Sequence, residues 1–169
     1  MKPTFFLLGF MGCGKSYWSQ KLAHQLDLQA IDLDTYIEEV EGRTIATIFA
    51  EQGEAIFREI EKQHLRLLPV GESRTIIALG GGTPCFFDNM AYANEIGTTI
   101  YLRTSTDILV DRLWHNSENR PLLQGKSKAA LRLFIEQKVA ERQQYYEQAT
   151  YIMDVNEETE QQLLAIMKG

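Results

Sequence analysis

The sequence has 169 residues, with 17 lysines and arginines against 23 aspartates and glutamates, and a formal net charge of −6 at pH 7. Its length suits one domain, and its 44% hydrophobic and 24% charged residues are close to the averages of globular proteins. The acidic balance argues against nonspecific binding to nucleic acid or to an anionic membrane, although it allows a local basic pocket.

Short apolar runs alternate along the chain with longer helical patterns. The apolar runs predict five strands, at residues 5–8, 29–32, 75–79, 98–102 and 151–153. The helical patterns predict helices at residues 16–26, 36–41, 44–52, 54–68, 86–94, 105–114 and 127–148, followed by a final helix that Asn156 caps. In the helix over 54–68 we expect Ile56, Phe57, Ile60 and Leu67 to face inward. The alternation favours one α/β domain over 1–169, with a five-stranded parallel sheet and helices on both faces.

The cysteines and the N-terminus bear on where the protein works. Cys13 and Cys85 are too few for a disulfide scaffold and lack the paired spacing of a zinc site, so we expect reduced thiols. The first residues lack the apolar core and cleavage site of a secretory signal. The uncharged run 5–14 is about half the roughly 20 residues that a membrane span needs. These features predict a cytoplasmic protein.

One motif carries a specific chemistry. Residues 9–16, Gly-Phe-Met-Gly-Cys-Gly-Lys-Ser, match G-x-x-x-x-G-K-[ST] between a predicted strand and a predicted helix. In such a loop the backbone N–H groups of Gly12, Cys13 and Gly14 would hold a phosphate, and the helix N-terminus would add positive charge. Lys15 would reach the β- and γ-phosphates and the Ser16 hydroxyl would bind Mg²⁺. No guanine-reading Asn-Lys-x-Asp motif is present, which favours ATP over GTP.

Two further clusters of charged residues each allow two interpretations. Asp32 and Asp34 follow a predicted strand, where one carboxylate could hold Mg²⁺ through water and the other accept a proton from a hydroxyl. An acidic turn with a helix cap would have the same sequence. Arg58 and Glu61 are three residues apart on one helix and so share a face. They form either a surface ion pair or an arginine directed at a substrate carboxylate, held in place by the glutamate.

Two loops complete the candidate site. Gly80, Gly81 and Gly82 directly follow a strand, where bare backbone allows a polar ligand to approach, although a flexible turn is the alternative. The polar loop, about 115–126, contains Arg120 beside a proline, and this arginine could cover the phosphates as part of a lid.

Taken together, these motifs resemble the shikimate kinase family, a group with the nucleoside-monophosphate-kinase-like P-loop fold. The markers are residues 9–16, 32–34 (Asp-Leu-Asp), 56–61 (Ile-Phe-Arg-Glu-x-Glu), 80–82 (Gly-Gly-Gly), 120–123 (Arg-Pro-Leu-Leu) and 142–146 (Arg-x-x-x-Tyr). The resemblance spans essentially the whole chain. It implies a three-layer fold with a substrate-binding helical region at about 33–61. It also implies transfer of the γ-phosphoryl group of ATP to the 3-hydroxyl of shikimate, in aromatic amino-acid (chorismate) biosynthesis.

The resemblance also implies a role for each residue of the site. Asp34 would be the base, with Lys15 and Arg120 as the other catalytic residues, and Asp32 would lie in the outer shell of a Mg²⁺ ion held by Ser16. Arg58 and Arg142 would hold the shikimate carboxylate, with Glu61 supporting Arg58. Gly80, Gly81 and Gly82 would contact the ring hydroxyls, Phe49 and Phe57 would form an apolar wall, and Arg112 would stack on adenine. Residues 154–158 lack the arginine that is common in the family's adenine loop.

Two other functions fit the sequence less well: Arg58, Gly80–Gly82 and Arg142 argue against the first, and the presence of Lys15, Asp34 and Arg120 argues against the second. A related small-metabolite kinase, such as a gluconate kinase, would share the phosphate loop. A P-loop domain that senses nucleotide or shikimate would be expected to lose a catalytic residue or to carry a partner domain. The expected partners are ATP, Mg²⁺ and shikimate, with neither nucleic acid nor membrane, and the expected state is a monomer. The neighbouring Tyr145 and Tyr146 leave open which of them packs inward.

Overall fold

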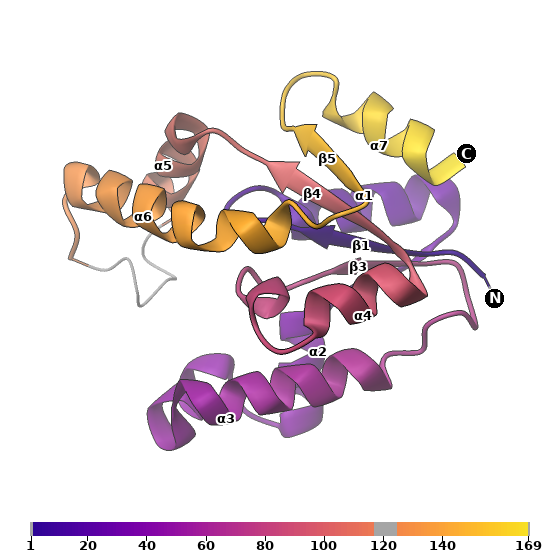
Figure 1. The fold of residues 1–169 in the computed structure, drawn as a ribbon, viewed down its shortest axis with the longest axis horizontal. Coiled ribbons are helices and arrows are strands. Elements are labelled where there is room, and N and C mark those ends of the chain that lie inside the picture. The colour runs from indigo at the N-terminus through magenta and orange to yellow at the C-terminus, as the bar shows by residue number, and fades with distance from the viewer. Residues whose placement is uncertain (1, 117–124, 169) are drawn as a thin grey trace.

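The computed structural model describes residues 2–116 and 125–168, in which strands and helices alternate (Figure 1). The strands are β1 (Thr4–Leu8), β2 (Gln29–Asp32), β3 (Thr75–Ala78), β4 (Thr98–Arg103) and β5 (Tyr151–Asp154). The helices are α1 (Lys15–Leu26), α2 (Leu33–Glu41), α3 (Ile45–Leu67), the 3-10 turn η1 (Thr83–Cys85), α4 (Asn89–Ile96), α5 (Thr106–His115), α6 (Lys128–Tyr146) and α7 (Thr159–Lys168). Each of the five predicted strands is present.

The strands form one parallel sheet in the order β2-β3-β1-β4-β5. β1 is the central strand, and its residue Leu7 is paired with Ala78 on one side and with Ile100 on the other. Every neighbouring pair is parallel, so the chain returns across the sheet through helices between successive strands. The predicted parallel sheet of five strands is confirmed.

Alternating side chains of the sheet divide the core into two halves. Phe5 and Leu7 of β1 pack with residues of α1, α5, α6 and α7, whereas Phe6 and Leu8 pack with residues of α2, α3 and α4. This division follows from the strand geometry, because successive side chains point to opposite faces. The helices therefore cover both faces of the sheet, with α2, α3 and α4 below it in the view of Figure 1. The predicted three-layer α/β architecture is confirmed.

Three helical segments differ from the prediction. The helix expected from residue 36 begins at Leu33, directly after its N-cap Asp32. The helices expected at 44–52 and 54–68 are joined in α3, with a kink at Gly53, where φ is +80°. The helix expected from residue 86 begins only at Asn89, because η1 and a left-handed Phe87 (φ +51°) precede it. Ile56 and Leu67 were expected inward, but they are 46% and 68% exposed. The buried face of this part of α3 instead includes the polar residues Arg58, Glu61 and His64.

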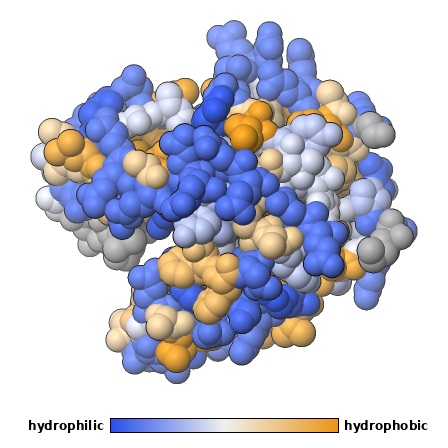
Figure 2. Space-filling model, in the orientation of Figure 1, coloured by the Kyte–Doolittle hydropathy of each residue, from blue (hydrophilic) through white to orange (hydrophobic). Residues whose placement is uncertain are grey.

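The fold brings the candidate site residues to one edge of the sheet. β1 leads into the phosphate loop, β2 ends at Asp32 and β3 leads into the three glycines. Because the strands are parallel, these carboxyl ends share one edge, where ligands bind in open α/β sheets. Hydrophilic residues cover most of the face seen in Figure 2, which is hollowed between the parts that contain α6 and α3. Among the described residues no helix is both long and apolar enough to cross a membrane.

Candidate functional site

The phosphate loop connects β1 to α1 and ends in a left-handed glycine. Gly14, with φ +102°, is the N-cap of α1, a conformation that glycine adopts at little cost. The Lys15 ammonium folds back over the loop and donates to the carbonyl oxygens of Gly9 (2.8 Å) and Phe10 (3.1 Å). The side chain of Cys13 is fully buried, and its Sγ lies 3.7 Å from the Lys15 ammonium. The loop thus presents N–H groups, a helix N-terminus and an ammonium together.

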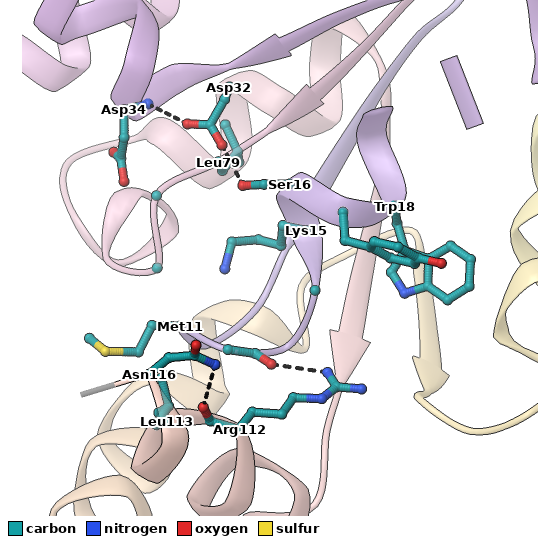
Figure 3. Close-up of a pocket in the computed structure, with 15 residues that line it drawn as sticks. Met11, Lys15, Ser16, Trp18, Asp32, Asp34, Leu79, Arg112, Leu113 and Asn116 are labelled. Carbon is teal, nitrogen blue, oxygen red and sulfur yellow. Dashed lines mark hydrogen bonds between the residues drawn. The ribbon is translucent and has the colours of Figure 1, made fainter. Parts of the chain in front are cut away.

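A cavity of about 470 Å³ opens beside this loop (Figure 3). It is lined by Met11, Gly12, Gly14, Lys15, Ser16, Tyr17, Trp18, Asp32, Asp34, Leu79, Gly80, Gly81, Arg112, Leu113 and Asn116. Arg112 of α5 donates to the carbonyl oxygen of Gly12 (3.0 Å), so its guanidinium lies against the phosphate loop. The structure therefore brings the predicted phosphate, metal, base and adenine residues into one space. The aromatic residues Tyr17 and Trp18 also line it, which the sequence analysis did not identify.

Asp32 connects the phosphate loop to the start of α2. Its Oδ2 accepts a hydrogen bond from the Ser16 hydroxyl (2.5 Å), and its Oδ1 accepts from the backbone N–H groups of Asp34 and Thr35 (3.1 and 3.2 Å). Asp32 is thus the N-cap of α2, as one interpretation of this acidic turn predicts, and it also lines the cavity, so the cap does not exclude the functional interpretation. Its N-cap bonds fix the first turn of α2, on which Asp34 lies.

Asp34 is half-buried, and it lies between the phosphate-loop cavity and the glycine turn at Gly80. Burial, which disfavours the charged form, raises its pKa from the usual 3.8 to about 6. The carboxylates of Asp32 and Glu61 raise this pKa further, whereas Lys15 and Arg58 oppose the rise. A carboxyl group with this pKa is ionised at neutral pH and takes up a proton more readily than a free aspartate. Such tuning is typical of groups that exchange protons during catalysis.

Arg58 and Glu61 form a buried ion pair, so a surface pair is excluded. Nη1 of Arg58 donates to Oε2 of Glu61 at 2.9 Å, and their side chains are only 10% and 1% exposed. The exposed Glu54 accepts from Nε and Nη2 of the same guanidinium (3.3 and 3.2 Å). The guanidinium carbon also lies 4.2 Å from the centre of the Phe86 ring. With carboxylates and an aromatic face around it, Arg58 has one defined orientation.

Each of the three glycines lies next to a different charged side chain. A Cβ atom on Gly82 would lie 2.5 Å from Nη2 of Arg58, and one on Gly80 would lie 2.9 Å from Oδ1 of Asp34. One on Gly81 would lie 3.4 Å from Nη1 of Arg142, which extends from α6 on the other side. A side chain at Gly80 or Gly82 would therefore displace Asp34 or Arg58. The turn is a close-packed element between two arginines and a carboxylate.

The two phenylalanines predicted to form an apolar wall lie together near Arg58. The rings of Phe49 and Phe57 lie 4.7 Å apart, and the Arg58 guanidinium carbon is 5.1 Å from the centre of the Phe57 ring. Phe57 is buried, whereas Phe49 is partly exposed at the surface of α3. Most of the predicted lid at 115–126 lies outside the described residues. Arg120 is among the residues that are not described.

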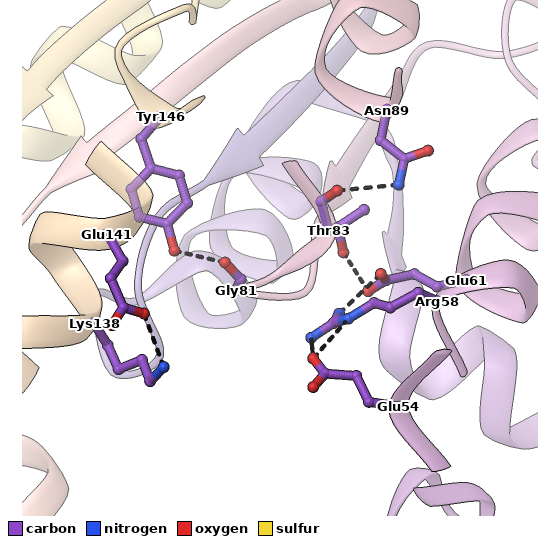
Figure 4. A network of polar contacts seen from close by, with 9 residues as sticks. All are labelled: Glu54, Arg58, Glu61, Gly81, Thr83, Asn89, Lys138, Glu141 and Tyr146. Atoms are coloured by element: carbon purple, nitrogen blue, oxygen red, sulfur yellow. Dashed lines mark hydrogen bonds and ion pairs between the residues drawn. The ribbon is translucent and has the colours of Figure 1, made fainter. Parts of the chain in front are cut away.

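Several residues that hold the site together were not predicted. The hydroxyl of Thr83 donates to Glu61 (2.6 Å), and Nδ2 of Asn89 donates to the carbonyl oxygen of Thr83 (3.0 Å) (Figure 4). Tyr146 is the inward tyrosine of α6: it is fully buried and its hydroxyl donates to the carbonyl oxygen of Gly81 (2.5 Å). The Arg-x-x-x-Tyr marker contains Tyr146, but no motif identifies its partner Gly81 or the contacts of Thr83, because each contact joins residues from separate elements.

A phosphate loop between a strand and a helix of a parallel α/β sheet, with a cavity beside it, defines the class of the protein: it is a P-loop nucleotide-binding protein. The family model described as shikimate kinase matches residues 11–168. A shikimate kinase from Bacteroides fragilis is 47% identical over 148 residues, which are 87% of this chain and 82% of that protein. The chain therefore belongs to the shikimate kinase family.

Solved structures of relatives match the fold over nearly its whole length. The crystal structure of shikimate kinase from Bacteroides thetaiotaomicron gives a TM-score of 0.92 at 36% identity and covers 99% of both chains. The structure of shikimate kinase from Acinetobacter baumannii in complex with shikimate gives 0.87 at 29% identity, over 99% of this chain and 94% of that one. The P-loop α/β fold of this chain is thus the fold of its family.

Proposed function

We propose that this chain phosphorylates the 3-hydroxyl of shikimate with ATP and that the cavity and glycine turn form its active site. The single observation that carries the assignment of the site is the position of Asp34. Its carboxylate lies next to Gly80, in the cavity that Lys15 also lines, and Arg58 and Arg142 flank the same glycine turn. A hydroxyl beside Asp34 would thus face the phosphate loop, while a carboxylate of the same molecule could reach the arginines.

The phosphate loop binds the triphosphate of ATP in this proposal. Backbone N–H groups at Gly12, Cys13 and Gly14 hold the phosphates, and Lys15 exchanges its two carbonyl contacts for phosphate oxygens. Arg112 lies against the loop at Gly12, where its planar guanidinium can stack on adenine. The assignments of residues 115–126 as a lid and of Arg120 as its arginine rest on the sequence alone.

Ser16 and Asp32 have the chemistry that a Mg²⁺ ion requires. Their oxygen atoms lie 2.5 Å apart and both residues line the cavity beside Lys15. Mg²⁺ prefers oxygen ligands and usually combines one or two protein groups with substrate phosphates and waters. Consistent with this, the described residues contain no cluster of three or more His, Cys, Asp or Glu that could hold a metal alone. When bound, Mg²⁺ would neutralise charge on the β- and γ-phosphates.

Asp34 accepts the proton that the attacking hydroxyl loses. As the new bond forms between the 3-oxygen and the γ-phosphorus, the bond from that phosphorus to the β-phosphate oxygen breaks and ADP leaves. Lys15 remains on the phosphates and compensates their negative charge. A carboxylate with a pKa of about 6 is ionised before this step at neutral pH and can hold the proton after it.

Arg58 and Arg142 select for a carboxylate in the substrate. An arginine fork matches a carboxylate geometrically, and two arginines beside one glycine turn favour an anionic over a neutral polyol. Phe49 and Phe57 provide apolar surface next to this position, within the substrate-binding region at about 33–61. We further propose a cytoplasmic monomer that requires Mg²⁺ and ATP, without nucleic acid or membrane partners.

A pair of variants on one helix tests the site. Arg142→Ala removes an arginine beside Gly81, whereas Arg132→Ala removes an exposed arginine of α6 that pairs with Asp107. We expect Arg142→Ala to weaken shikimate binding at least tenfold in calorimetry, with ADP binding changed less than threefold. Arg132→Ala should leave both affinities unchanged. Equal effects of the two variants on shikimate binding would contradict this placement of the carboxylate.

A further inference from the structure

Thr83 is a buried hydroxyl residue directly after the three glycines. It is fully buried, and its hydroxyl donates at 2.6 Å to Oε1 of Glu61, the oxygen that does not accept from Arg58. The two oxygens of Glu61 therefore have different partners, Arg58 on one side and Thr83 on the other. A carboxylate held at both oxygens cannot rotate without losing one of these hydrogen bonds.

The backbone of Thr83 is itself fixed on two sides. Its N–H donates to the carbonyl oxygen of Gly80 (3.1 Å), which closes the glycine turn. Its own carbonyl oxygen accepts from Nδ2 of Asn89 (3.0 Å), and Oδ1 of Asn89 accepts from Arg66 of α3 (2.9 Å). Thr83 thus links the glycine turn, α3 and α4, and Figure 4 shows it between Asn89 and Glu61.

We propose that Thr83 is a positioning residue: through Glu61, its hydroxyl orients Arg58, the arginine that binds the substrate carboxylate. This inference rests on the proposed function. The hydroxyl holds Glu61 in the rotamer in which its other oxygen faces Arg58. Without it, Glu61 keeps only the arginine as a partner and the pair can turn together away from Gly82. The other carboxylate partner of the guanidinium, Glu54, is 57% exposed and holds it less firmly. Loss of the hydroxyl should therefore affect the carboxylate substrate and leave the nucleotide unaffected.

Three variants separate positioning from stability. Thr83→Val keeps the shape of the side chain and removes the hydroxyl, and Thr83→Ser keeps the hydroxyl. Thr99→Val is the matched control, because Thr99 is a fully buried threonine of β4 whose hydroxyl donates to Asn94 (2.5 Å), away from the site. The measurements are KM for shikimate, KM for ATP and the thermal midpoint. A hydrogen bond to a charged group corresponds to a change in equilibrium of about tenfold or more.

We expect Thr83→Val to raise KM for shikimate about tenfold with KM for ATP changed less than twofold. Thr83→Ser should have the wild-type values of both. Thr99→Val should lower the thermal midpoint without changing either KM. The inference is wrong if Thr83→Val leaves KM for shikimate unchanged, or if Thr99→Val raises it equally. If the valine variant does not fold, Thr83→Ala is measured in its place. If the wild-type protein phosphorylates a different hydroxy acid and not shikimate, the proposed function is wrong. The KM of each variant relative to wild type, measured with that acid, would still decide the role of Thr83.

Discussion

Replacing Asp34 with asparagine should make the protein more stable and almost inactive. Asparagine keeps the size of the side chain and removes its charge. In the folded protein this charge lies in a half-buried position near the carboxylates of Asp32 and Glu61. The folded state therefore disfavours the ionised form of Asp34, which is the form that accepts the proton. Asp34→Asn therefore removes both a charge that destabilises the fold and the group that accepts the proton.

The size of the effect follows from the pKa. A rise from 3.8 to about 6 means that the folded state binds the Asp34 proton more tightly than the unfolded state does. The stability that Asp34 contributes is therefore fully present below pH 3.8 and is lost as pH rises through about 6. Above that range, ionised Asp34 destabilises the fold by about 3 kcal/mol. For a domain of this length, 3 kcal/mol corresponds to about 6–12 °C in thermal midpoint.

The assay is thermal unfolding of wild type and Asp34→Asn between pH 4 and pH 8, together with turnover and ADP affinity. The variant should unfold at a higher temperature at pH 8, and the difference should shrink as pH falls from 6 to 4. It should bind ADP normally and lose most of its turnover. A variant that is less stable than wild type at pH 8, or a difference that does not depend on pH, would refute this account of the Asp34 environment.

Three other predictions concern the pH dependence, the nucleotide and the metal. In wild type, kcat/KM for shikimate should fall about tenfold between pH 7 and pH 5, because Asp34 must be ionised; in Glu61→Gln the fall should begin at lower pH, since Glu61 raises the pKa of Asp34. A pH profile unchanged by that substitution would oppose this electrostatic coupling. Arg112→Ala should raise KM for ATP five- to tenfold with KM for shikimate unchanged, as steady-state kinetics will show; a larger effect on shikimate would move Arg112 out of the nucleotide site. Chelation of Mg²⁺ should abolish turnover, and Ser16→Ala should raise the Mg²⁺ concentration needed for half-maximal rate; full activity in a chelator would exclude the metal.

Contiguous motifs made much of the site predictable from the sequence. The phosphate loop needs glycines, a lysine and a serine at fixed spacing between a strand and a helix, and residues 9–16 have that arrangement. The alternation of apolar runs with helical patterns likewise predicted the parallel sheet. The position of Asp32 was harder to predict, because a helix N-cap and a residue facing the cavity have the same sequence signature. In the structure one oxygen of Asp32 caps α2 and the other accepts from Ser16.

The parts that the sequence did not predict depend on contacts between distant elements. In the helix after Gly53, Phe57 and Ile60 pack on the core as predicted, whereas Ile56 and Leu67 do not. The buried face also contains the charged residues Arg58 and Glu61, which a hydrophobic pattern assigns to solvent. Thr83 was not predicted because its hydroxyl contacts a residue 22 positions away. The choice of Tyr146 over Tyr145 depended on where the α6 face meets the glycine turn. In each case a tertiary contact overrides the local pattern.

The most direct test of the central claim is ADP release by the purified protein with ATP and Mg²⁺, measured with shikimate and with a panel of hydroxy acids that includes gluconate. Membership of the shikimate kinase family, with Asp34 and two arginines around one glycine turn, predicts release that requires an acceptor and is fastest with shikimate, with phosphate on the 3-hydroxyl of the product. Faster phosphorylation of gluconate, or no release that depends on shikimate from the folded protein, would contradict the account.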